Sequence, residues 1–332
     1  MSTLLAGDIG GTKTLLATYR LSEGELVQQR AERFVSADWL DFAALVNHYL
    51  EAEPPSDRPS HACFAVAGPV RGGRVQLTNL PWHLEVKALA RACGLSEVEL
   101  VNDFAVLIYG LPHLQAHQQA LLRAGASGPD PEAPVAILGA GTGLGVAIGV
   151  PTPQGLQAIA SEASHAEFAP RTEAEWQLKT WLKQDLQLER VSIERVVSGT
   201  GLGEVMRWLL ATDPAGAGHP LAAIDATERP AATAEAAAAG DPLARQAMDL
   251  WLGAYGSTAG DLALQTLCSG GLWLGGGTAG KLLQELRSAT FLEPLLRKGR
   301  LSPAVDQVPV MALTDPEAGV FSAACRARSL MG

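Results

Sequence analysis

The sequence predicts an α/β protein built from two domains, and three observations lead to this prediction. The chain has 332 residues, more than the ~150 that one domain typically uses. Short apolar runs that end in glycine or aspartate alternate with stretches of helical spacing. A pattern of strand, glycine turn and strand occurs twice, about 130 residues apart, which suggests two related α/β halves.

The first half of the chain alternates between strands and helices. The opening reads as a hairpin, with two strands flanking the turn Asp8–Thr12. The segment Trp39–Ala52 has apolar residues at helical spacing, and either Ser36 or Asp38 could cap it. In chain order, we expect strands at Leu4–Gly7, Thr14–Tyr19, Ala62–Ala67 and Val98–Val101, and helices at Trp39–Ala52, Val86–Cys93 and Phe104–Leu111.

The second half repeats the opening design and then becomes mostly helical. No charged residue occurs between Glu132 and Glu162, a length that approaches a membrane-spanning helix. Glycines in its middle, each costing a helix roughly 1 kcal/mol, favour a strand, a glycine turn and a strand over Val135–Val150 instead. Beyond it we expect helices at Glu173–Asp185, Leu243–Leu267 and Pro316–Leu330, a short element at Ser192–Val196, a surface excursion with a helix in Ala211–Gly240, and strands at Leu272–Leu274 and Val308–Leu313.

Charge and composition exclude several classes of partner. The chain has 35 acidic and 25 basic residues, so its formal net charge is −10. A field of this sign repels phosphate backbones and anionic lipids, so we expect neither a nucleic-acid nor a membrane partner. With 47% hydrophobic and 18% charged residues, the chain is not disordered.

The cysteines and the opening residues indicate the compartment. The four cysteines include no C-x-x-C pair, which predicts buried thiols in a reducing compartment and no zinc site. The first residues reach Asp8 without a cationic segment, unlike a signal peptide. We therefore expect a cytoplasmic protein.

Three glycine-rich segments are candidates for binding phosphate. In Asp8–Thr12, glycines would let backbone N–H groups approach an anion, Thr12 adds a donor, and Asp8 could hold Mg²⁺; the alternative is an ordinary hairpin turn. The segment Gly139–Gly145 lacks the dinucleotide-binding spacing but suits an anion-cradling turn. The segment Gly275–Leu282 nearly matches a P-loop, but Leu282 replaces the required hydroxyl, which argues against one.

Two polar segments are candidates for binding hydroxyl groups. Asn102 and Asp103 follow an apolar strand, and ligands of α/β sheets bind at such strand ends; the alternative is a helix-capping pair. The segment Ser161–Glu167 holds two acids and a histidine. A metal site there would need a second copy of the motif, which is absent, so a polar ligand site and a solvated loop remain.

Taken in order, these motifs resemble those of the bacterial glucokinases, ATP-dependent hexose kinases outside the repressor and kinase (ROK) family. The resemblance covers nearly the whole chain. It rests on Gly7–Thr12, Thr78–Trp82, Val101–Phe104, Gly139–Gly145, Glu162–His165, Glu194–Gly199 and Leu274–Gly277. It implies an actin-like ATPase (ribonuclease H-like) fold, in which two α/β domains surround a cleft: a small domain of residues 1–104 plus 315–332 and a large one of residues 105–314.

The resemblance also implies roles for individual residues. Asp103 would be the catalytic base, and the sugar hydroxyls would be held by Asn102, Asp103, Glu162, His165 and Glu194. The polyphosphate of ATP would be held by Asp8, Gly10, Gly11, Thr12, Gly141, Thr142, Gly143, Gly275, Gly276 and Gly277, with Mg²⁺ at Asp8. The product would be glucose 6-phosphate, and we expect a homodimer in which sugar binding closes the two domains.

The chain departs from the family pattern beside the Glu-x-x-His motif, where Ser161, Ala163 and Ser164 replace the usual glycines. This departure bears on sugar affinity more than on reaction type. Three alternatives stay open: a kinase for another hexose or an amino sugar, a sugar-binding regulator without turnover, and an actin-like ATPase that serves a partner protein.

Overall fold

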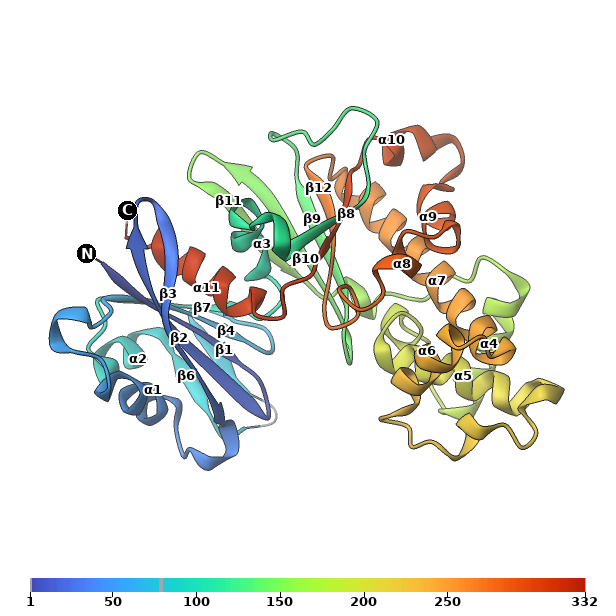
Figure 1. Ribbon diagram of the computed structural model, residues 1–332, viewed down its shortest axis with the longest axis horizontal. Helices are drawn as coiled ribbons and strands as arrows, with labels where there is room; N and C mark the ends of the chain where they lie inside the picture. The colour runs from blue at the N-terminus through green and yellow to red at the C-terminus, as the bar shows by residue number, and fades with distance from the viewer. Residues whose placement is uncertain (1, 78–79, 332) are drawn as a thin grey trace. The chain divides into compact units, whose positions relative to one another are not determined.

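The computed structural model describes residues 2–77 and 80–331 and divides the chain into two compact units. Unit 1 comprises Met1–Gln118, Thr152–Ala160 and Asp315–Gly332, and unit 2 comprises Gln119–Pro151 and Ser161–Thr314. Each unit is built around one β-sheet with helices packed on it (Figure 1). The architecture is therefore α/β, as the sequence predicts.

The sheet of unit 1 has the strand order β3-β2-β1-β4-β7. Strands β1, β4 and β7 are parallel, whereas β2 is antiparallel to both β1 and β3. In the parallel part Ile9 pairs with Val66, which pairs with Asn102, so three strands end at the same edge. The bounds are β1 Thr3–Ile9, β2 Lys13–Ser22, β3 Glu25–Val35, β4 His61–Val66 and β7 Glu97–Asn102, with a separate pair of β5 Arg74–Gln76 and β6 His83–Glu85.

Helices cover both faces of this sheet. Helix α1 (Phe42–Glu51) and helix α2 (Val86–Cys93) share one core with Leu5, Phe64 and Leu100 from the sheet. The C-terminal helix α11 (Ala318–Ser329) packs against β1, β4 and α3 (Leu107–Gly110) on the other face (Figure 1). The prediction that the end of the chain returns to the first domain is confirmed.

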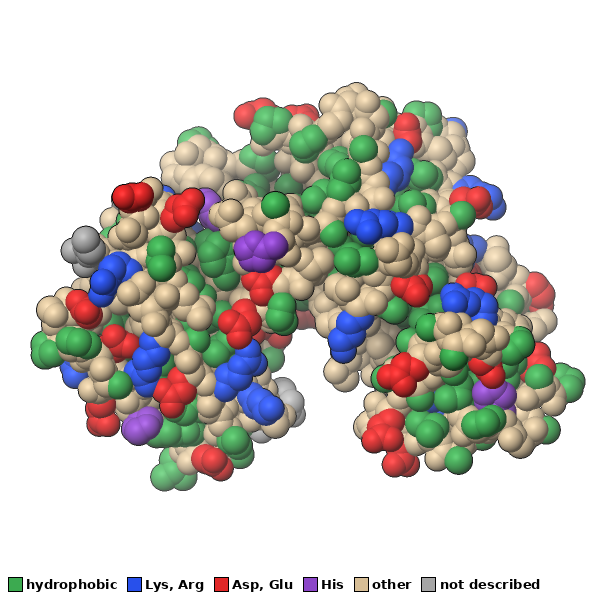
Figure 2. Space-filling view, in the orientation of Figure 1, with side chains coloured by type: hydrophobic (Ala, Val, Ile, Leu, Met, Phe, Trp, Pro, Cys, Tyr) green, Lys and Arg blue, Asp and Glu red, His purple; other side chains and the backbone are tan. Residues whose placement is uncertain are grey.

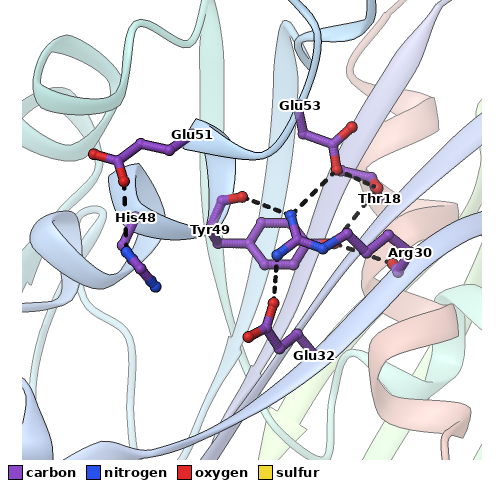
Figure 3. A network of polar contacts seen from close by, with 7 residues as sticks. All are labelled: Thr18, Arg30, Glu32, His48, Tyr49, Glu51 and Glu53. Carbon is purple, nitrogen blue, oxygen red and sulfur yellow. Dashed lines mark hydrogen bonds and ion pairs between the residues drawn. The ribbon is translucent and has the colours of Figure 1, made fainter.

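A polar network joins α1 to strands β2 and β3 (Figure 3). The guanidinium of Arg30 lies 4.2 Å from the ring centroid of Tyr49 and donates to the Tyr49 carbonyl at 2.7 Å. The Tyr49 hydroxyl donates to the Arg30 carbonyl at 3.1 Å, and Glu53 pairs with Arg30 at 3.6 Å. Because the partners come from different elements, the network fixes α1 on the sheet.

The six-stranded sheet, whose strands lie in unit 2 except for β11, has the strand order β11-β10-β9-β12-β13-β8. Strand β9 is antiparallel to β10 and parallel to β12, which is parallel to β13. This is the order of the unit 1 sheet with β8 added at one edge, so the predicted duplication is confirmed. The bounds are β8 Gln119–Arg123, β9 Val135–Ala140, β10 Leu144–Thr152, β11 Gly155–Ser161, β12 Gly271–Gly275 and β13 Val310–Leu313.

The helices of unit 2 pack around α7 (Pro242–Thr266), whose Trp251 and Tyr255 are fully buried. Helices α5, α6 and α9 all contact α7, and with the sheet they form one large core. The remaining bounds are α4 Glu173–Asp185, α5 Gly199–Thr212, α6 Arg229–Ala238, α8 Leu283–Leu286, α9 Ala289–Leu296 and α10 Ser302–Asp306.

Three local predictions need correction. Asp8 lies within β1, paired with Leu15 and Ala65, so the turn is confined to Gly10–Thr12. Helix α1 is capped by neither Ser36 nor Asp38: Asp41 accepts from the Ala44 N–H at 2.8 Å. The helix predicted over Phe104–Leu111 shrinks to α3, because Asn102 ties down the first residues and Pro112 cannot donate to a continuing helix.

The apolar segment between Glu132 and Glu162 folds as β9 and β10, as its glycines predict, and as β11, which the sequence does not predict. Within residues 2–77 and 80–331, no helix has the length and apolarity needed to cross a membrane. All four cysteines are buried free thiols. Figure 2 shows acidic and basic side chains interspersed over the face that it displays.

Candidate functional site

In unit 1, Asn102 and Asp103 lie at the edge where the parallel strands end. The side-chain oxygen Oδ1 of Asn102 accepts from the N–H groups of Phe104 and Ala105, at 3.1 and 3.0 Å. Its amide nitrogen donates to Asp103 Oδ1 at 3.0 Å and to the Gly68 carbonyl at 3.3 Å. Asn102 therefore caps the turn, as the capping alternative predicts, and also orients the Asp103 carboxylate.

The environment of Asp103 changes its acidity. Although the side chain is exposed, the surrounding protein partly desolvates its carboxyl, and the negative charge of Asp8 adds repulsion; together they raise its pKa to about 6. Hydrogen bonds from the backbone and from Asn102 act in the opposite direction. A carboxylate with such a pKa is a better base near neutral pH than an ordinary aspartate.

Asp8 and the turn Gly10–Thr12 lie at the same edge of unit 1. Burial raises the pKa of Asp8, and the positive charge of Arg33 partly offsets the effect. The Gly10 N–H donates to the Lys13 carbonyl at 3.0 Å, and Ser36 donates to the carbonyls of Gly10 and Thr12, each at 3.0 Å. Because the Gly10 and Thr12 carbonyls are occupied, the turn can present N–H groups to an anion.

Asp8 and Asp103 suit a magnesium ion that binds together with a phosphate group. Among residues 2–77 and 80–331, no group of three or more His, Cys, Asp or Glu side chains could hold a metal. Asp8 and Asp103 are close enough for their charges to interact. Mg²⁺ commonly binds through one or two carboxylates, with phosphates and waters as its other ligands. Asp8 therefore suits a metal that a nucleotide helps to hold.

In unit 2, the turn Gly141–Gly143 joins β9 to β10. The Gly141 N–H donates to the Gly143 carbonyl at 2.8 Å, which closes the turn. Strand β12 ends beside it: Gly276 has φ +79°, and a Cβ there would lie 2.6 Å from the Ala140 carbonyl. Thr278 donates its hydroxyl to that same carbonyl at 2.8 Å. The structure thus brings Gly275–Gly277 next to the second glycine turn.

The predicted sugar-binding residues of unit 2 fall on two short 3₁₀ segments. Glu162 precedes the segment Ala163–His165 and His165 ends it; both side chains are exposed, and Glu162 Oε2 lies 3.7 Å from His165 Nε2. The Ile193 N–H donates to the Ala166 carbonyl at 2.9 Å, which brings the segment of Glu194 alongside. These three side chains are therefore gathered in one region of unit 2.

Glu194 has a partner that the sequence does not reveal. Its Oε2 accepts from the Leu144 N–H at 2.9 Å, so the carboxylate binds the end of the second glycine turn. Its role as a sugar ligand stays a prediction.

The substitutions beside the Glu-x-x-His motif are accommodated in two ways. Ser164 is buried, and the Ser161 hydroxyl accepts from the Ala163 N–H at 3.2 Å. Of the sequence motifs, Thr78 and Asn79 lie outside the described residues.

Sequence reasoning missed Ser36, Thr200 and Thr278, whose hydroxyls donate to carbonyls of the two glycine turns or of Ala140 beside them. Only Thr200 had a signal, because the sequence Gly-Thr-Gly-Leu-Gly occurs at both 141–145 and 199–203.

Comparison with known proteins identifies the family. A family model described as Glucokinase matches residues 5–330. The chain belongs to the glucokinase family. A glucokinase of Nostoc punctiforme is 39% identical over 344 residues, covering 99% of this chain and 100% of that protein. A glucokinase of a Synechocystis species is 38% identical over 349 residues, covering 98% of each.

Solved structures of glucokinases agree with this membership. The crystal structure of a glucokinase from an Antarctic psychrotroph has a TM-score of 0.86 and 32% identity and covers 99% of both chains. A ROK-family glucokinase from Streptomyces griseus, in complex with glucose and AMPPNP, has a TM-score of 0.63 at 20% identity, so it shows the fold alone. The predicted actin-like ATPase fold is confirmed, as is the resemblance to the bacterial glucokinases.

Proposed function

We propose that this chain transfers the γ-phosphoryl group of ATP to the 6-hydroxyl of glucose, giving glucose 6-phosphate and ADP. The observation that carries the proposal is the pair Asn102 and Asp103 at the end of parallel strands, where Asn102 orients a carboxylate whose pKa is about 6. Membership of the glucokinase family supports the choice of substrate.

Asp103 acts as the base in this proposal. It orients the primary hydroxyl of the sugar and accepts its proton as the oxygen begins to bond to phosphorus. Deprotonation comes late because a sugar hydroxyl is a far weaker acid than a carboxylic acid. Asn102, Glu162, His165 and Glu194 hold the sugar hydroxyls, so that one oxygen is placed for attack.

The glycine turns hold the nucleotide. Backbone N–H groups of the turns Gly10–Thr12 and Gly141–Gly143, other than those of Gly10 and Gly141, which close the turns, bind the phosphates, and Gly275–Gly277 lies along the nucleotide. Asp8 would hold Mg²⁺, which would neutralise phosphate charge when bound. The occupied carbonyls of both turns support this assignment, since a free carbonyl oxygen would repel a phosphate.

We also propose that the chain is cytoplasmic and forms a homodimer. Four buried free thiols suit a reducing compartment, and the net charge of −10 disfavours nucleic acid and membrane surfaces as partners. The resemblance to bacterial glucokinases supports the dimer. Size-exclusion chromatography with light scattering measures the oligomeric state directly.

The test is ADP release with Mg·ATP against a panel of glucose, mannose, fructose and glucosamine. We expect release to depend on glucose and on Mg²⁺. A preference for another sugar would replace the substrate and keep the reaction class. ATP hydrolysis that ignores every sugar would refute the proposal in favour of a non-sugar actin-like ATPase.

A further inference from the structure

The second copy of Gly-Thr-Gly-Leu-Gly, at residues 199–203, lies against the first copy in unit 2. The Gly199 N–H donates to the Gly141 carbonyl at 2.7 Å. The Thr200 hydroxyl donates to the Thr142 carbonyl at 2.8 Å. A Cβ on Gly199 would lie only 2.7 Å from the Gly141 oxygen, so this approach requires glycine.

These contacts complete the hydrogen bonding of the carbonyls along the turn. Four consecutive carbonyls, Ala140 to Gly143, accept from Thr278, Gly199, Thr200 and Gly141 respectively. Within the part of the chain that the structure describes, no protein group accepts from the N–H of Thr142 or Gly143. The turn therefore has its acceptors satisfied and two donors available, the arrangement that an anion requires.

Residues 198–200, which contact the glycine turn, are themselves anchored in the core. Ser198 caps helix α5, and its hydroxyl accepts from the Gly201 N–H at 2.9 Å. Its carbonyl accepts from the indole N–H of Trp251, which is fully buried in α7. Because both the hydroxyl and the carbonyl of Ser198 are hydrogen-bonded, Gly199 and Thr200 hold a defined position beside the turn.

We propose that Thr200 is a positioning residue for nucleotide binding. Its hydroxyl, together with the Gly199 N–H, holds the Gly141–Gly143 turn so that the N–H groups of Thr142 and Gly143 face the polyphosphate. This inference rests on the proposed function only in assigning the turn to a nucleotide phosphate. It assigns no contact with the sugar to Thr200.

The test measures Mg·ATP binding by calorimetry without sugar, followed by KM for ATP and for glucose. We expect Thr200→Val to weaken Mg·ATP binding about three- to tenfold, the usual effect of losing one hydrogen bond. The KM for glucose should stay unchanged, and Thr200→Ser should restore binding to within about twofold. The matched control is Thr212→Val at the other end of α5, where the hydroxyl donates to the Trp208 carbonyl.

Gly199→Ala supplies a second, independent arm. Alanine at this position presses on the Gly141 oxygen, so the turn must shift and nucleotide binding should weaken; circular dichroism at the assay temperature confirms that the variant is folded. Unchanged Mg·ATP binding in both Thr200→Val and Gly199→Ala would overturn the proposal. The proposal would also be overturned if Thr200→Ser weakened Mg·ATP binding as much as Thr200→Val, or if the Thr212→Val control did so. A parent that binds Mg·ATP but does not phosphorylate glucose would contradict the proposed function, while the variants would still decide this inference.

Discussion

At the scale of single residues, substitution of Asp103, the proposed base, tests catalysis separately from sugar binding. Asn at this position keeps the size and hydrogen bonding of Asp but loses its basicity, so Asp103→Asn should lower kcat by ~10²–10⁴ and largely spare sugar affinity. Glu162→Gln should instead raise KM for glucose. Steady-state kinetics beside calorimetric sugar binding check both. If Asp103→Asn keeps kcat within about threefold of the parent, Asp103 is no base.

The raised pKa of Asp103 also predicts how stability depends on pH. The folded chain holds a proton on Asp103 up to about pH 6, whereas the ordinary pKa of an aspartate is 3.8. The folded state therefore binds more protons in this window, so the Asp103 contribution to stability falls as pH rises from about 4 to 6. Because asparagine does not titrate, Asp103→Asn removes this pH-dependent loss of stability.

We therefore expect Asp103→Asn to melt at a higher temperature than the parent at pH 8, with the difference shrinking toward pH 4. Thermal denaturation followed by circular dichroism across this range measures it. Asp57→Asn is the control for removing an aspartate elsewhere in unit 1. Asp57 lies on a short 3₁₀ segment and pairs with Arg20. An equal difference at both pH values would contradict the titration of Asp103.

At the scale of elements, an ion pair fixes helix α11 on the sheet of unit 1. Arg326 donates Nε to Glu99 Oε2 at 2.6 Å and Nη2 to Oε1 at 3.2 Å, and its guanidinium lies 4.7 Å from the ring centroid of Tyr109. Both ionic side chains are less than a third exposed. Arg326→Ala should lower the free energy of unfolding by about 1–3 kcal/mol.

Urea denaturation measures this loss. Arg326→Lys should recover less than half of it, because an ammonium cannot make the two-pronged contact or stack in the same way. Arg297→Ala is the control, since the pair of Arg297 with Glu293 is largely exposed and should change stability little. Full recovery by lysine would show that charge alone holds α11.

At the scale of the whole molecule, the predicted site residues are divided between the units. Asp8, Asn102 and Asp103 belong to unit 1, whereas Glu162, His165 and Glu194 belong to unit 2. Phosphoryl transfer needs both sets of residues on the same substrates with water excluded, so we expect sugar binding to draw the units together.

Small-angle scattering should therefore show a smaller radius of gyration at saturating glucose. Asp103→Asn, which should still bind sugar, should compact as well, which separates closure from turnover. An unchanged radius in a chain that binds glucose by calorimetry would contradict closure.

The elements with strong local signals could be predicted from the amino-acid sequence. Helices α4 and α7 begin and end within a residue of their predicted bounds, because caps at Thr172 and Asp241 lie next to clear helical spacing. The strand, turn and strand of residues 135–150 followed from glycines at every second position from 139 to 145, each of which costs a helix roughly 1 kcal/mol. The placement of Asn102 and Asp103 followed from a buried strand that ends at a polar pair.

Contacts between distant segments depend on tertiary packing and could not be predicted. Strand β3 is largely exposed and carries little apolar signal, so its pairing with β2 defines it. Glu194 binds the Leu144 N–H across 50 positions, and Thr200 binds the Thr142 carbonyl across 58. Local periodicity records which face of an element is buried, whereas a hydrogen bond between distant segments depends on how the whole sheet and its helices pack.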